Sequence, residues 1–273
     1  GYRHVYGVDI EPYGIKPLRA YSQVLLQDNV LQAIATINHQ PSTINPQLTP
    51  EQWLEAYQRI SQNNQLTTPN NVSNNLAFHR LLTEGIPLEI HKDGNSQGEQ
   101  VWLIDWNEPG NNEFLVINQL TITHDSLKGK YKRWPDLILY INGIPLVVIE
   151  LKNATDANAT IQGAYNQIQT YQAQIPQLFT YNAFCVISDG LEAKAGTLSA
   201  DFSRYMTWKT KTGDTEAHRH EPQLNVLIQG LLNPVTLLDM VRHFIVFEAS
   251  KTEDKNGIIT ISNIKKMAAY HQY

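Results

Sequence analysis

The chain has 273 residues, of which 42% are hydrophobic and 17% charged, so it contains enough apolar material for a folded core. This composition excludes collagen, a coiled coil and a disordered low-complexity tail. The formal charge of -5 argues against a protein that holds nucleic acid mainly through a bulk basic surface, and it leaves room only for a local basic channel.

Nothing in the sequence predicts a membrane span or a secretion signal. The longest apolar runs, 137–141 and 144–149, are far shorter than the ~20 residues of a spanning helix, and 1–12 has no apolar signal core. We therefore expect a soluble protein. Cys185, the single cysteine, lies in the apolar run 184–187, which predicts a buried structural thiol and excludes disulfides and cysteine-based zinc sites.

The amino-terminal part of the chain predicts helices. Apolar residues recur at helical spacing over 22–38, which predicts an amphipathic helix with Ser22 as its cap. Residues 49–62 begin with Thr-Pro-Glu-Gln, a capping box with proline at the first helical position, and predict a second helix. The stretch 63–75 is crowded with Asn, Thr and Pro and predicts a loop, and 76–84 predicts a short helix that ends before a glycine. The second helix should bury one face, formed by Trp53, Leu54, Tyr57 and Ile60.

The next part of the chain predicts a sheet. Three segments between turn-forming clusters alternate or run apolar with β-branched residues and predict antiparallel strands, namely 88–91, 101–105 and 114–123. Two strongly apolar strands, 137–141 and 145–151, then surround Asn142-Gly143, which is a strong hairpin signal.

A helix and a further strand follow this hairpin, at 160–172 and 184–187. The crossover would make the last strand parallel to the strand before the helix. The helix should pack on the sheet through Ile161, Ala164, Tyr165 and Ile168. These elements predict an α/β (α+β) protein with a mixed sheet flanked by helices, preceded by a helical and antiparallel part.

A polar and charged stretch, 209–222, predicts a domain boundary. After it, 224–232 and 235–244 predict two short helices and 256–262 a strand or loop, a small helical extension that is too small to fold alone. No glycine-rich phosphate loop ends in Gly-Lys-Ser or Gly-Lys-Thr, which excludes a nucleotide-hydrolysing motor within these residues. We therefore divide the chain into a domain 1–210, with a helical lead-in 1–85 and a sheet-containing core 86–205, and a linker and connection 211–273.

Charged residues gather at the open end of the predicted hairpin. Pro135-Asp136 opens its first strand, and Glu150-Leu151-Lys152 closes its second. Alternation along a strand puts Glu150 and Lys152 on one face. Carboxylates are hard oxygen ligands for Mg2+, which polarises a scissile phosphate and lowers the pKa of a bound water, and a lysine can steer that water or neutralise developing charge. The pattern fits a magnesium-dependent phosphodiesterase, although an ordinary ion pair at a strand edge would use the same residues.

The face of Asp136 depends on the length of the hairpin turn. A strict two-residue loop pairs Asp136 with Ile149, so that the aspartate points away from Glu150. A three-residue loop with Gly143 in the left-handed conformation places Asp136 opposite Val148, on the face of Glu150. We predict the three-residue loop; a two-residue loop corrected by a bulge elsewhere in the hairpin would restore the same parity.

The residues around this pattern resemble a known family. The run 134–153, Trp-Pro-Asp-Leu-Ile-Leu-Tyr-Ile-Asn-Gly-Ile-Pro-Leu-Val-Val-Ile-Glu-Leu-Lys-Asn, strongly resembles the nuclease motif of the restriction (R) subunit of type I restriction-modification enzymes. The resemblance extends over essentially the whole chain, through the blocks 78–85, 103–114, 165–176, 186–193 and 268–273.

The resemblance implies a PD-(D/E)xK restriction-endonuclease-like fold. It implies catalytic roles for Asp136, Glu150 and Lys152, with Mg2+ held by Asp136, Glu150 and the backbone carbonyl of Leu151. Lys152 would serve the attacking water.

The resemblance also assigns a role to the helix after the hairpin. Gln167 and Tyr171 match the Gln-x-x-x-Tyr element that similar nucleases place near the active site and the DNA. Their spacing of four puts them on one helical face, which permits that role.

The same resemblance implies a type I site-specific deoxyribonuclease that cuts double-stranded DNA after ATP-driven translocation, in the cytoplasm of a prokaryote. ATP would bind to motor domains carried by the same subunit outside this chain, and modification and specificity subunits would complete the complex. We expect an amino-terminal piece of the subunit that is inactive or weak alone. The alternative is a non-catalytic assembly or DNA-docking module of the same complex.

Three other groups of polar residues carry weaker hypotheses. His218 and His220 lie in the charged linker and are expected to be solvated rather than metal ligands. The basic run 128–133, just before Asp136, predicts either phosphate contact or a charged loop. A second metal site is conceivable at three carboxylates, but the turn residues between them favour a loop: Asp105, Glu108 and Glu113.

Overall fold

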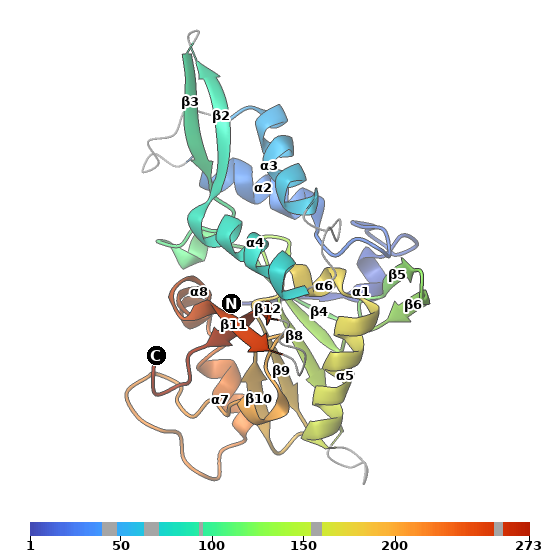
Figure 1. Cartoon of the computed structure of the whole chain (residues 1–273), viewed down its shortest axis with the longest axis vertical. Helices are drawn as coiled ribbons and strands as arrows, with labels where there is room; N and C mark the ends of the chain where they lie inside the picture. Colours follow the sequence, from blue (N-terminus) through green and yellow to red (C-terminus); the bar gives the residue numbers. More distant parts are fainter. Residues whose placement is uncertain (40–47, 63–70, 93–94, 154–159, 254–258) are drawn as a thin grey trace.

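The computed structural model describes residues 1–39, 48–62, 71–92, 95–153, 160–253 and 259–273, and Figure 1 shows how their elements are arranged. In chain order these elements are β1 (Arg3–Tyr6), α1 (Gly7–Ile10), α2 (Gln27–Ile37), α3 (Pro50–Gln62), α4 (Asn71–Glu84), β2 (Ile86–Lys92), β3 (Asn95–Val101), η1 (Pro109–Asn111), β4 (Phe114–Asn118), β5 (Ile122–Ser126), β6 (Gly129–Arg133), β7 (Leu137–Ile141), β8 (Ile144–Leu151), α5 (Ile161–Gln174), α6 (Gln177–Thr180), β9 (Phe184–Ser188), β10 (Ala193–Gly196), η2 (Phe202–Arg204), α7 (Gln223–Gln229), α8 (Pro234–His243), β11 (Ile245–Glu253) and β12 (Ile259–Met267).

A six-stranded mixed sheet forms the centre of the fold, with the strand order β1-β4-β7-β8-β9-β10. β4, β7 and β8 are antiparallel neighbours, whereas β1 runs parallel to β4 and β9 parallel to β8. The predicted crossover from β8 to β9 is therefore confirmed. The chain has the predicted mixed α/β fold with flanking helices, which is consistent with a PD-(D/E)xK-like nuclease domain.

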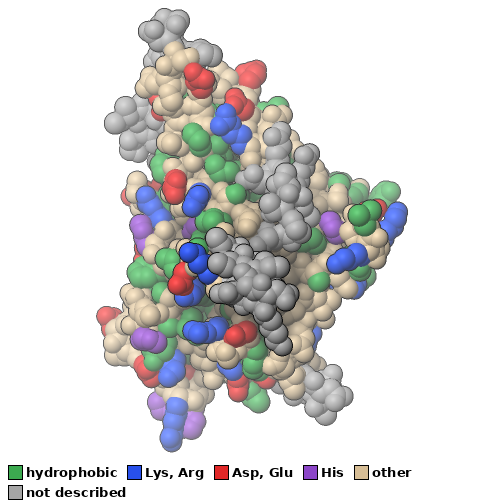
Figure 2. All heavy atoms as spheres, viewed as in Figure 1, with side chains coloured by type: hydrophobic (Ala, Val, Ile, Leu, Met, Phe, Trp, Pro, Cys, Tyr) green, Lys and Arg blue, Asp and Glu red, His purple; other side chains and the backbone are tan. Residues whose placement is uncertain are grey.

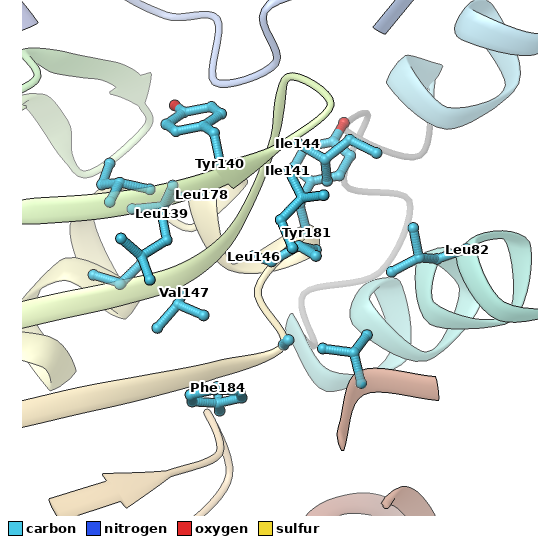
Figure 3. Packing of buried hydrophobic residues seen from close by; sticks show 14 of the residues in the cluster. Leu82, Leu139, Tyr140, Ile141, Ile144, Leu146, Val147, Leu178, Tyr181 and Phe184 are labelled. Atoms are coloured by element: carbon cyan, nitrogen blue, oxygen red, sulfur yellow. The ribbon is translucent and has the colours of Figure 1, made fainter. Parts of the chain in front are cut away.

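The central hairpin is buried on both faces because its strands are apolar almost throughout. All of β8 except Leu151 and all of β7 except Leu137 are buried. Figure 3 shows part of this core, in which Leu178, Tyr181 and Phe184 lie close to the hairpin. α5 packs on β8 and β9 through the predicted face, with Ile161, Ala164 and Ile168 buried and Tyr165 half-buried. The prediction for this helix is confirmed.

The first long helix begins later than its periodicity predicts. α2 starts at Gln27, and Ser22 does not cap it. The residues before it are irregular because they pack directly on the central hairpin: the Leu26 N–H donates to the Gly143 carbonyl at 3.0 Å, and the Tyr140 hydroxyl donates to the Val24 carbonyl at 2.9 Å. Tertiary bonds therefore replace what would have been the first helical turns.

The next helices follow the predicted signals in part. The capping box of α3 is confirmed, because the Thr49 N–H donates to the Gln52 side chain at 2.8 Å. Leu54 of α3 is 41% exposed, so the predicted apolar face is wrong at this residue.

α4 begins at Asn71, although the sequence predicts a loop over 63–75; the part 63–70 lies outside the described residues. The Asn75 amide makes helix possible here, because it donates to three buried carbonyls, those of Phe179, Thr180 and Asn182.

The strand predictions between 86 and 133 need three corrections. Residues 102–105 do not continue the strand β3, because side chains take their backbone groups: the Trp102 N–H donates to Asn38, and the Asp105 N–H donates to Asn112. The predicted strand 114–123 is broken at Gln119, which has a positive φ of 51°. The basic run 128–133 is largely a strand, β6, paired with β5. β1 and β10, which the sequence did not predict, extend the sheet at its two edges.

The carboxyl-terminal part packs on the same core as the sheet. The two predicted helices are confirmed as α7 and α8, and their buried residues Leu227, Leu237 and Val241 belong to the same apolar cluster as the central strands. β12 pairs with β11, so the part of 256–262 that the structure describes is strand. Within the described residues no single helix has the length and apolar character to cross a membrane, and α7 and α8 meet that criterion only as a pair bent by 78°.

Lys265 of β12 is a buried cation at the junction between this tail and the sheet. It is 1% exposed, and its ammonium donates to Asn75 Oδ1 and to the Asn182 carbonyl, both at 2.8 Å. Burial lowers the pKa of Lys265 to about 7, and the pKa of the nearby His79 falls to about 3 through its own burial and the charge of Lys265. The buried Cys185 opposes the shift of Lys265 slightly, while burial raises the pKa of its own thiol to about 12.

We expect the stability of the chain to rise with pH between about 7 and 10.5 through Lys265. In this window the unfolded chain binds a proton at this lysine that the folded chain has released, so the free energy of unfolding increases with pH. Urea unfolding at several pH values should show a smaller rise for Lys265→Met than for the exposed control Lys266→Met. An equal rise in both variants would contradict the assignment.

Candidate active site

The turn of the central hairpin has two residues. Ile141 pairs with Ile144, and Asn142 and Gly143 both have positive φ, of 51° and 77°, as in a type I′ turn. The predicted three-residue loop is therefore wrong. The two-residue turn is held because Asn142 accepts the Glu113 N–H at 2.7 Å and donates to the Leu103 carbonyl at 2.9 Å.

A bulge in β8 corrects the parity of the hairpin. Tyr140 pairs with Pro145, but Leu139 pairs with Val147, so Leu146 is an extra residue between them. Its carbonyl leaves the ladder to β7 and accepts the Ala183 N–H at 2.7 Å. The predicted alternative, a two-residue turn corrected by a bulge, is thus confirmed.

The bulge brings Asp136 opposite Glu150. Leu137, the first residue of β7, pairs with Ile149, so continuing the register by one residue sets Asp136, just before the strand, against Glu150. Asp136 is fixed through both carboxylate oxygens: Oδ2 accepts the Leu151 N–H at 2.8 Å, and Oδ1 accepts the Gln119 side-chain amide at 2.8 Å. The charge of Asp136 acts on the pKa of Glu150, so the two carboxylates lie near each other. That they bind one metal ion stays a prediction.

Glu150 is a buried carboxylate with two donors. It is 3% exposed; its Oε1 accepts from Lys152 Nζ at 2.7 Å, and its Oε2 accepts from the Tyr171 hydroxyl at 3.1 Å. Burial raises the pKa of Glu150, and the negative charge of Asp136 raises it further, while Lys152 and Tyr171 oppose the shift. The pKa of Glu150 is therefore raised, with burial as the main cause.

α5 carries the two helical residues of the site. Thr160 caps this helix by accepting the Gly163 N–H at 3.0 Å. Tyr171 is buried against Glu150, and burial followed by the charge of Glu150 raises the pKa of its phenol. A hydrogen bond from Gln167 to Tyr171 lowers that pKa in part, so the two residues are neighbours as their spacing predicts.

The predicted site residues thus come together from β7, β8 and α5. Gln119, which holds Asp136, was not predicted, because a glutamine in an apolar segment carries no sequence signal for this contact. The role of the Leu151 carbonyl remains a prediction.

Within the described residues no group of three or more His, Cys, Asp or Glu side chains could hold a metal. Mg2+ does not need such a group, because one or two carboxylates with waters and substrate phosphate oxygens complete its shell.

Two other groups of candidate residues lie in loops. Asp105 accepts the backbone N–H groups of Asn107 and Glu108, as expected of a loop. His218 and His220 lie in a surface segment with their rings 5.1 Å apart. Cys185 is buried, as predicted.

Comparison with known proteins places this geometry in a family. The family described as type I restriction enzyme R protein N terminus matches residues 1–204. The chain belongs to this family. It is 37% identical over its whole length to the type I restriction enzyme HindI endonuclease subunit of Haemophilus influenzae, of which it covers 24%. It is 29% identical over 92% of its length to a Methanocaldococcus jannaschii protein with the provisional name of type I restriction enzyme MjaIXP endonuclease subunit, of which it also covers 24%. The chain thus spans about a quarter of the length of these two relatives.

Gly143→Ala should destabilise the R-protein chain by about 1–3 kcal/mol. Gly143 has a φ of 77°, and a Cβ there would lie 2.6 Å from the Leu26 carbonyl oxygen, so both the turn and the chain packed on it would be strained. Thermal or urea unfolding measures this cost. Gly98→Ala is the matched control, because nothing lies within 4 Å of its added Cβ; equal effects of the two substitutions would argue against the turn described here.

Glu150→Gln should raise the stability of the metal-free chain near pH 7.5, and the gain should shrink toward pH 4. A carboxyl whose folded pKa is raised contributes stability at low pH that is lost as the pH rises through that pKa. Melting temperatures across this range test the sign. Glu192→Gln is the control, because Glu192 also pairs with a lysine two residues on, at 3.0 Å, but is 49% exposed. A gain that grows toward low pH would refute the assignment.

Proposed function

We propose that this chain is the magnesium-dependent endonuclease part of a type I restriction enzyme R subunit and hydrolyses phosphodiester bonds of double-stranded DNA. The observation that carries the proposal is the bulge at Leu146, which sets Asp136 opposite Glu150 with Lys152 on the same carboxylate. A strand-edge ion pair would need neither the bulge nor a buried glutamate. The names of the relatives, which are endonuclease subunits of type I restriction enzymes, support the same activity.

The donor set fits Mg2+. Asp136 and Glu150 offer oxygen ligands, each carboxylate has lone pairs left beside the hydrogen bonds it accepts, and the Leu151 carbonyl is our proposed third ligand. Bound there, the ion would polarise the scissile phosphate and lower the pKa of a coordinated water.

The protein's own groups prepare this chemistry. Lys152 and Tyr171 donate to Glu150 and thereby favour its ionised form against the effect of burial. Lys152 is 30% exposed in its side chain, so its ammonium can reach both Glu150 and a water or phosphate oxygen beside it. We assign to it the orientation of the attacking water, and to Gln167 and Tyr171 a place beside the DNA.

The rest of the enzyme lies outside this chain. We propose that ATP-driven translocation is performed by motor domains of the same subunit, that modification and specificity subunits complete the complex, and that it acts in the cytoplasm of a prokaryote. The names of the two relatives, each called an endonuclease subunit, support an enzyme of several subunits. The second candidate, a non-catalytic docking module, has no observation of its own in its favour.

Lys152→Ala in the intact enzyme should reduce DNA cleavage by at least about 100-fold and leave ATP-driven translocation running, because the lysine serves only the hydrolytic step. Lys194→Ala is a closely matched control, since Lys194 also pairs with a glutamate two residues before it and is 24% exposed. Loss of translocation together with cleavage would mean that Lys152 is structural.

Calorimetric titration of the chain with Mg2+ tests the metal site separately. Binding should be lost in Glu150→Ala and kept in Glu192→Ala. Absence of Mg2+ binding by the unaltered chain, with a short DNA duplex present, would favour the docking module.

A further inference from the structure

The hairpin β5–β6 is a basic surface that the active site does not use directly. We call residues 122–133 the basic hairpin: they contain Lys128, Lys130, Lys132 and Arg133 against a single acidic residue, Asp125, in a chain whose overall charge is -5. Figure 1 shows the basic hairpin projecting from the edge of the molecule opposite the tail strands β11 and β12. Figure 2 shows basic side chains exposed on this projection.

The base of the basic hairpin is fixed on both sides. The Thr123 N–H donates to the Tyr21 carbonyl at 3.0 Å, and the Gln177 amide donates to the Thr123 carbonyl at 2.9 Å. Arg133 Nε donates to Gln174 of α5 at 2.6 Å. The hairpin therefore holds its lysines at a defined place on the molecule.

Two of its lysines share the outer face, and Lys128 lies in the turn before β6. Lys132 pairs with Thr123 and Lys130 with Asp125 across the strands, so these side chains lie on one side, while Tyr131 and Arg133 on the other side are half-buried. Lys130 is 86% exposed, and its 3.4 Å ion pair with Asp125 is too exposed to hold it strongly. The outer face is thus available to an anion.

The basic hairpin also lies next to the site. Arg133 contacts α5 at Gln174, and Glu150 contacts α5 at Tyr171, three residues earlier, which is a rise of ~4.5 Å along the helix. Lys132 precedes Asp136 by four residues, so their Cα atoms are at most ~14 Å apart, about four base pairs of duplex. A duplex with its scissile phosphate at Glu150 would bring further phosphates within reach of these lysines.

We propose that the outer face and turn of the basic hairpin, with Lys128, Lys130 and Lys132, bind the phosphate backbone of double-stranded DNA beside the scissile bond; this rests on the nuclease function proposed above. A duplex is favoured over a single strand because the substrate proposed above is double-stranded. Lys132 Nζ lies 5.4 Å from the ring of Trp134 and 5.6 Å from that of Tyr21, so these rings orient the ammonium.

The test measures DNA binding without cleavage. The full chain is titrated onto a fluorescent 30-base-pair duplex in EDTA at several NaCl concentrations, and the affinity is followed by anisotropy. The triple variant Lys128→Gln, Lys130→Gln, Lys132→Gln should bind the duplex at least about tenfold more weakly. Its slope of log affinity against log salt should be shallower by about 2 to 3, because binding with fewer phosphate contacts releases fewer counterions from the DNA.

A second triple variant controls for net charge: Lys209→Gln, Lys251→Gln and Lys266→Gln remove the same charge from the tail, and Lys209 lies 5.4 Å from the ring of Tyr270, as Lys132 does from Trp134. The control should change the slope by less than about 0.5. Four results would each overturn the proposal. They are an equal loss of affinity in the two triple variants, an unchanged salt slope in the hairpin variant, no duplex binding by the unaltered chain, and an equal loss of affinity for single-stranded DNA.

The two proposals fail differently. Because the binding assay contains no metal and allows no cleavage, it measures the DNA contact separately from the nuclease activity. Normal DNA binding and cleavage by the hairpin variant would contradict the proposed DNA contact and leave the proposed nuclease function standing. If the intact enzyme does not cleave DNA but the salt slope still depends on the hairpin lysines, the proposed nuclease function is contradicted and the proposed DNA contact stands.

Discussion

One extra residue in β8 decides which charged side chains come together at the candidate active site. Side chains alternate strictly along a β-strand, so a regular two-residue hairpin would turn Asp136 away from Glu150. Leu146 breaks the alternation once, between the turn and the candidate site, and every side chain of β8 beyond it changes face. The bulge is stable because the freed carbonyl of Leu146 is bonded by Ala183 and by the Asn182 amide, in the segment that leads into β9.

The same segment links the site to the carboxyl-terminal part of the chain. Asn182 donates to Leu146, and its backbone carbonyl accepts from Asn75 of α4 and from Lys265 of β12. The bulge, the helical lead-in and the tail therefore meet at one residue. Because the two hydrogen-bond partners that the structure describes for the buried Lys265 ammonium are neutral oxygens, this junction is costly to form and is sensitive to protonation. The apparent division of the sequence at its charged linker is bridged in space by a shared polar cluster.

The candidate site contains a carboxylate pair that is unfavourable for stability. Glu150 is 3% exposed next to a second carboxylate, and its two donors Lys152 and Tyr171 offset the burial only in part. A divalent ion would relieve this repulsion. The residues that break the local rules of a stable sheet, a buried acid and a bulge, thus coincide with the proposed function, as is expected of catalytic centres.

Local patterns in the sequence determined much of this architecture. The apolar hairpin around Asn142-Gly143, the crossover helix, the capping box at Thr49 and the shared face of Glu150 and Lys152 all follow from short-range periodicity and turn chemistry, and the structure contains them. These features depend on residues that are near one another in the chain.

Contacts between distant segments decided the rest. The turn length could not be predicted, because Asn-Gly suits both a two-residue and a three-residue loop, and the choice rests on bonds from Asn142 to residues about 30 to 40 positions earlier. The late start of α2, the helical state of Asn75 and the bulge at Leu146 have the same origin: each backbone or amide group found its partner in a segment remote in sequence. Periodicity specifies which face of an element is apolar, but only the assembled core specifies which buried polar groups will meet, and that meeting placed Asp136 opposite Glu150.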